Sequence, residues 1–193
     1  ARQMFQPTRK KIEWLQLQSS KILDDISEKD LEYGHVYIIV IDYLREMTEQ
    51  VDSILKSSYK HVDNNHKPLT QEQIDELQEV HYMVRTIFNN IIEAFQTLDT
   101  EKLNKWNTEF KDSANQIRDI RKKQINRIKK RKVGTRNSIL YLQMLSDFRN
   151  MMLFANRILR VLEDLLESNN GDDDEQVEYM DDSSITINPP HKN

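Results

Sequence analysis

Residues that form turns are scarce along this chain. Its 193 residues include only three Gly and four Pro, whereas a β-sheet protein needs a turn about every 8–12 residues and builds it from Gly, Pro, Asn and Asp. The scarcity therefore predicts long helices, and the length predicts one domain with its own hydrophobic core. There is no Cys, which excludes disulfides, thiolate metal sites and cysteine nucleophiles.

Apolar residues recur at helical spacing over five segments. These segments are 8–27, 30–61, 70–98, 99–134 and 135–168. Pro7 is expected to mark the start of the first, Thr70 and Gln73 predict a capping box on the third, and Gly134 predicts a left-handed stop after the fourth. Because the intervening loops are short, we predict an all-α, antiparallel up-and-down bundle of about five long helices. The fifth helix is apolar around more than half its circumference and should be the most buried.

The formal net charge of −4 is unevenly distributed. Residues 169–193 carry seven acidic residues and one Lys, so this segment has a net charge of −6 and residues 1–168 have one of +2. The acidic segment is too polar to offset the entropy of ordering. We therefore predict a helical bundle over 1–168 and a disordered acidic tail over 169–193.

No apolar run approaches the roughly 20 residues that a membrane-spanning helix requires. The chain begins with Ala1 rather than Met. We expect it to be a segment of a longer polypeptide or a chain with a trimmed tag.

Positive charge is concentrated near the end of the fourth predicted helix. Ten basic residues fall within 19 positions, and we call them the basic ridge: Arg118, Arg121, Lys122, Lys123, Arg127, Lys129, Lys130, Arg131, Lys132 and Arg136. Ile125 and Ile128 are expected on the apolar face. The ridge could be a solvated helix face, or it could contact the anionic inner leaflet, the acidic tail or nucleic acid. No aromatic residue interleaves these bases, so a platform for base stacking is not indicated.

Three strings of this sequence carry a family resemblance. They are IDYLREM at 41–47, HVDNNHKPL at 61–69 and KQINRIKKRKVGTRNSILYLQMLSDFRNMML at 123–153. Over about Tyr37 to Leu162 the chain resembles the C-terminal cytosolic PhoU-like domain of bacterial, Bacteroidetes-type, Na/Pi-cotransporter family proteins. The resemblance implies an antiparallel helical bundle that follows a transmembrane phosphate carrier in the parent chain. It also implies a place at the cytoplasmic face of the inner membrane.

PhoU proteins carry a paired metal motif, an acid followed four residues later by Asp. A spacing of four places both side chains on one helix face, where two such helices could offer oxygen ligands to a divalent or iron ion. The matching positions here are Asp42 with Glu46 and Gln143 with Asp147, and Gln143 departs from the pattern as a neutral ligand. The alternatives are a solvated flank at Asp42 and Glu46, and a polar seam of Gln143, Asp147 and Asn150 packed on another helix.

Two other groups have spacings that metal sites use. His61, Asp63 and His66 fall within six residues, although Asp and Asn are ordinary in turns and His61 could instead cap the preceding helix. Glu32 and His35 have the spacing of di-iron bundles but lack a second copy. The sequence contains no serine elbow, P-loop or glycine fingerprint, so we expect no catalytic residues and no enzyme.

The functional expectation is a non-catalytic regulatory domain of a sodium-dependent phosphate transporter that modulates phosphate uptake. Its expected partner is the transmembrane carrier part of the same parent chain, with anionic lipid and a homodimer left open. The alternative is a freestanding helical adaptor that binds polyanions, nucleic acid or anionic lipid, through the basic ridge. No cofactor is expected beyond the metal ion considered above.

Overall fold

The structure is a computed structural model that describes residues 2–27 and 30–178. Its elements are five helices, α1 (Arg2–Asp25), α2 (Leu31–Asp63), α3 (Gln71–Thr97), α4 (Thr100–Lys129) and α5 (Thr135–Glu178). No strand occurs in the described part of the chain. The predicted all-α class and the predicted number of helices are confirmed.

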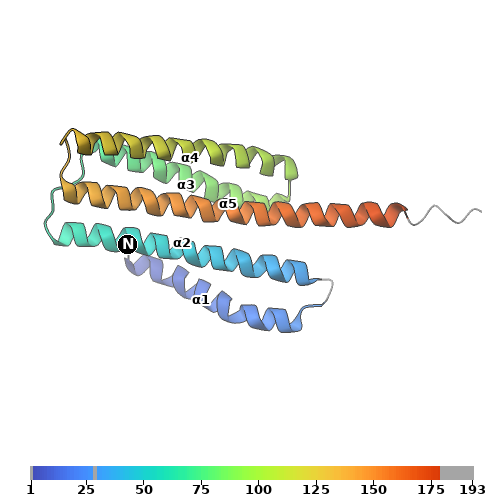
Figure 1. Cartoon of the computed structure of the whole chain (residues 1–193). Helices are drawn as coiled ribbons and strands as arrows, with labels where there is room; N and C mark the ends of the chain where they lie inside the picture. Colours follow the sequence, from blue (N-terminus) through green and yellow to red (C-terminus); the bar gives the residue numbers. More distant parts are fainter. Residues whose placement is uncertain (1, 28–29, 179–193) are drawn as a thin grey trace, which may run out of the picture.

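Helix α5 is the central element of an antiparallel bundle. It packs against α2 on one side and against α3 and α4 on the other, while α1 packs on α2 (Figure 1). The first half of α5 lies within the bundle, and its end extends beyond the other helices (Figure 1). Because α5 contacts three helices, the positions along it determine which residues of α2, α3 and α4 are brought together.

The core follows from the apolar stripe of α5. Its side chains that are at most 2% exposed are Tyr141, Leu145, Met152, Ala155, Ile158, Leu159 and Leu162. They pack with buried apolar side chains of α2, α3 and α4 in one continuous cluster. Burying a single large apolar side chain contributes about 1.5–3 kcal/mol. The prediction that the fifth helix is the most buried is confirmed.

Helix α3 begins where local sequence predicted. Thr70 Oγ1 accepts a hydrogen bond from the Gln73 amide at 3.3 Å, and Gln73 Oε1 accepts one from the Thr70 amide at 3.0 Å. This reciprocal pair satisfies two amides that a helix start leaves free. Asp99 caps α4 in a similar way, by accepting from the amides of Glu101 and Lys102.

Two predicted helix boundaries were wrong. Helix α1 begins at Arg2 and contains Pro7 within it. Helix α4 ends at Lys129, and the left-handed residue after it is Arg131 with φ 53°, whereas Gly134 has no positive φ. Helix α5 extends to Glu178, and residues 179–193, most of the predicted tail, lie outside the described residues. None of the helices described is both long and apolar enough to cross a membrane.

Candidate functional site

The four candidate metal ligands do not converge. Asp147 of α5 faces Ser53 of α2, with Ser53 Oγ donating to Asp147 Oδ2 at 2.9 Å. Glu46 lies seven residues before Ser53, a separation of about 10 Å along the helix axis, and Asp42 lies one turn farther away. The two halves of the predicted site are therefore at different levels of the bundle, and we correct the prediction that they form one metal site.

The contacts that these four residues make also argue against a metal site. Asp42 is exposed and accepts a hydrogen bond from Gln16 of α1 at 3.2 Å, and Glu46 is paired with Arg45 at 2.8 Å. Both oxygens of Asp147 already accept protein hydrogen bonds, one from Ser53 and one from Gln143 Nε2 at 2.9 Å. The residues present do not fit the metal that the resemblance implies.

The polar seam on α5 is confirmed. Asp147 is 3% exposed and receives the two hydrogen bonds from Gln143 and Ser53. One turn on, Asn150 Nδ2 donates to Gln50 Oε1 of α2 at 3.1 Å. A buried carboxylate is costly without such donors, so the seam aligns α2 with α5 and satisfies Asp147 at the same time.

The remaining metal candidates also have other contacts. His61 Nε2 donates to the carbonyl oxygen of Lys67 at 2.9 Å, and its ring packs edge-to-face on His66 with centroids 5.1 Å apart. His61 thus ties the loop after α2 to the helix, and does not cap the helix carbonyls. Glu32 accepts a hydrogen bond from Ser168. Within the described ranges no three His, Asp or Glu side chains are grouped so as to hold a metal ion.

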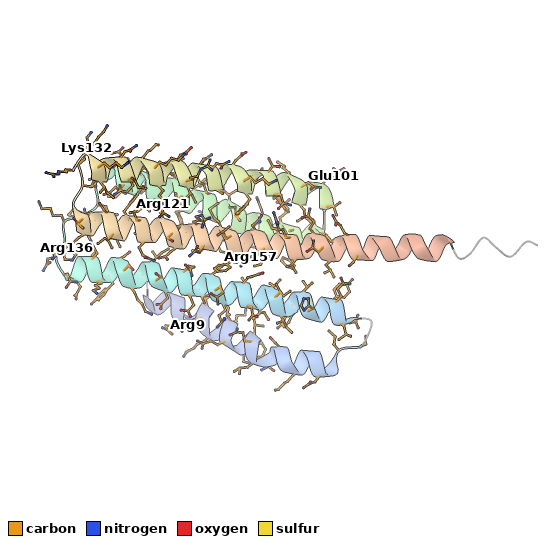
Figure 2. The ribbon with its side chains drawn as sticks, viewed as in Figure 1. Arg9, Glu101, Arg121, Lys132, Arg136 and Arg157 are labelled. Carbon is orange, nitrogen blue, oxygen red and sulfur yellow. The ribbon has the colours of Figure 1, made fainter. Side chains whose placement is uncertain are left out.

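Nine of the ten residues in the basic ridge are exposed. Figure 2 places Lys132 and Arg136 at one end of the bundle and Glu101 at the opposite end of α4. Ile125 and Ile128, expected on the apolar face, are 40% and 39% exposed. The surface therefore combines a dense positive charge with two accessible isoleucines.

Arg127 is the exception, and its assignment to the exposed ridge was wrong. Its side chain is 7% exposed and forms a two-point ion pair with Glu76 of α3 at 2.9 and 2.6 Å. Glu72 binds the same guanidinium at 2.8 Å. Hydrogen bonding to Glu76 raises the pKa of Arg127 above its usual value, and Arg127 in turn lowers the pKa of Glu72.

The ion pair belongs to a buried polar network that joins three helices. The Tyr141 hydroxyl of α5 donates a short hydrogen bond to Glu76, and burial together with that carboxylate raises the pKa of Tyr141. Gln124 Oε1 accepts from Arg127 at 3.0 Å and from Gln73 at 3.2 Å, and Gln124 Nε2 donates to Ser138 at 3.3 Å. Each of these buried side chains has a partner, as a stable buried network requires.

The loop after α2 meets the start of α5 beside this network. Arg136 donates to His66 Nδ1 at 3.2 Å, and Asn137 Nδ2 donates to the carbonyl oxygen of Pro68 at 2.7 Å. The second and third resemblance strings are therefore in contact in space. Sequence reasoning did not predict this contact, because its partners are about 70 residues apart.

Comparisons of the chain with protein-family models, with curated proteins and with solved structures find no match. The class of protein is therefore described by its structure alone, as an antiparallel helical bundle with one strongly basic end.

Proposed function

We propose that this chain is a non-catalytic regulatory domain, the cytosolic PhoU-like part of a sodium-dependent phosphate transporter, and that it modulates phosphate uptake. One observation carries the proposal: the strings at 61–69 and 123–153 that resemble this family contact each other at one end of the bundle through Arg136 and Asn137. Segments far apart in sequence thus form one surface. Such a surface is suited to coupling the bundle to a partner rather than to performing chemistry.

The basic ridge suits a position against the anionic inner leaflet. Lys and Arg near such a surface each contribute about 1 kcal/mol of attraction. Exposed Ile125 and Ile128 add apolar contact that a lipid interface accommodates. The alternative, an adaptor that binds polyanions such as nucleic acid, would use the same cations. It would give the two exposed isoleucines no apolar surface to contact.

Phosphate uptake by the parent transporter tests the regulatory role. Sodium-driven uptake of radiolabelled phosphate is measured in proteoliposomes for the full protein and for a version without this domain. We expect transport to persist and its response to phosphate concentration to change. An unchanged response, or a parent gene that encodes no apolar spans of about 20 residues before this domain, contradicts the proposal.

Vesicle binding tests the surface. Lys129→Gln with Lys130→Gln should weaken binding to phosphatidylserine vesicles at low salt roughly thirtyfold, because two contacts of about 1 kcal/mol are lost. The matched control is Lys105→Gln with Lys111→Gln, which removes equal charge from exposed positions elsewhere on α4. Co-sedimentation gives the affinities. Equal weakening by both pairs, or loss of binding to single-stranded RNA alone, argues against lipid as the ligand of this surface.

A further inference from the structure

A hollow at the basic end of the bundle is lined without any acidic residue. It has a volume of about 340 Å³, within the range of about 300–1,000 Å³ that small-molecule sites occupy. Its lining comes from the end of α2, the following loop and the first turns of α5: Ser57, Lys60, His61, Asn64, His66, Arg136, Ile139, Leu140 and Gln143. Four of these side chains can carry positive charge. None can carry negative charge.

Among the described residues, no carboxylate neutralises the cations of the hollow. No ion pair joins Lys60 or Arg136 to a carboxylate in residues 2–27 and 30–178. The hydrogen-bond partner of the Arg136 guanidinium is His66 Nδ1, a neutral acceptor at 3.2 Å. Elsewhere in this chain a less exposed guanidinium, that of Arg127, is held by two glutamates. Arg136 thus retains N–H groups for an anion.

The last carbonyl groups of α2 beside the hollow are occupied by hydrogen bonds from the loop. Amides of residues 64–66 donate to the carbonyl oxygens of residues 60–62 at 2.9–3.2 Å, so the C-terminal carbonyls of α2 that would repel an anion are occupied. The residues at the start of α5, Gly134 and Thr135, line a neighbouring hollow that shares His66 and Arg136 with this one.

We propose that this hollow binds a phosphate group. Donors reach the hollow from α2 (Lys60), from the loop (His66) and from α5 (Arg136). A tetrahedral phosphate can accept hydrogen bonds from all three directions, whereas a planar carboxylate suits such a three-sided arrangement less well. The group is either free inorganic phosphate or the phosphomonoester head of a lipid. The site includes Arg136 of the basic ridge but none of the other nine ridge residues, and it does not depend on the transporter assignment.

His66 provides a readout of occupancy. Partial burial, Arg136 and His61 lower its pKa in that order of importance. The charged and titratable groups around it are Lys60 and His61 of α2, Lys67 of the loop and Arg136 of α5. A phosphate bound among these cations favours the protonated imidazole, so the pKa of His66 should rise on binding.

The experiment is a titration of the full chain with inorganic phosphate at constant ionic strength, followed by NMR of the histidine rings. We expect a saturable shift of the His66 resonances and an increase in its pKa, with acetate producing neither. Arg136→Gln should weaken phosphate binding about tenfold to a hundredfold, as expected for a lost hydrogen bond to a charged group. The matched control Lys111→Gln removes an exposed cation of α4 that does not line the hollow, and it should leave the affinity unchanged.

A second arm separates the two sources of the phosphate group. Vesicles containing phosphatidic acid are compared with vesicles containing phosphatidylserine at equal surface charge. Saturable binding of inorganic phosphate supports a free-anion site, and a preference for phosphatidic acid that Arg136→Gln abolishes supports a lipid headgroup in the same hollow. The proposal is overturned if neither result is obtained, or if Arg136→Gln and Lys111→Gln weaken binding equally. Neither result depends on the uptake assay, so the two proposals fail separately.

Discussion

Replacing Arg127 with Met is expected to lower the free energy of unfolding by about 3–5 kcal/mol, the loss typical of removing one partner of a buried ion pair. Glu76 is only 8% exposed and would keep the Tyr141 hydroxyl as its remaining donor. Gln124 would lose one of its two donors as well. Urea denaturation followed by circular dichroism measures the change.

Two further variants separate the ion pair from general effects of charge. Lys130→Met removes an exposed cation three residues away and should change the free energy of unfolding by no more than about 0.5 kcal/mol. Adding Glu76→Leu to Arg127→Met should recover part of the loss, because the second change removes the unpaired buried carboxylate. A loss below about 1 kcal/mol for Arg127→Met would show that the pair does not hold these helices together.

The helical architecture could be predicted because its causes are local. Helical periodicity, scarce turn residues and the Thr70 capping box act within one or two turns, and the structure confirms them. The ends of the helices were harder to predict from the sequence. Helix α4 ends shortly before Arg131, which adopts a left-handed conformation. This conformation is strained for any residue other than Gly. The usual rule therefore indicated Gly134, which was the wrong residue.

The burial of Arg127 was missed although the sequence contains a signal for it. Buried residues of α4 fall at 117, 120, 124 and 127, which is one continuous helical stripe. Counting Arg127 among ten neighbouring cations concealed its place on that stripe. Ile125 was placed there instead, yet it lies about 140° around the helix from Ile120 at 3.6 residues per turn. Register along the helix, more than residue type, decides which of these side chains is buried.

The predicted metal site failed for a different reason. A spacing of four correctly places Gln143 and Asp147 together on α5, where they share a hydrogen bond. It says nothing about which level of α2 lies opposite. That level is decided by interhelical contacts such as Ser53 with Asp147 and Tyr43 with Phe154, whose rings stack 6.0 Å apart. Partners separated by about 100 residues cannot be aligned from one sequence without the fold.

Truncation of Ile158 to Ala is expected to lower the free energy of unfolding by about 2–5 kcal/mol. The side chain is 0% exposed and lies in the apolar cluster where α5 meets its neighbours. Removing three carbons there loses the transfer free energy and leaves a cavity that rigid helices cannot fill. Ile158→Val should cost about 0.5–1.5 kcal/mol, so a graded loss between the two variants would identify packing as the cause.

Ile139→Ala is the matched control because it makes the same chemical change on the same helix at a side chain that is 64% exposed. Since Ala has the higher helix propensity, this variant should be neutral or stabilise the protein by a few tenths of a kcal/mol. Thermal and urea denaturation of both variants give the comparison. If the two substitutions cost the same, Ile158 is not packed in the apolar core, because only a packed side chain loses contacts and leaves a cavity when it is truncated.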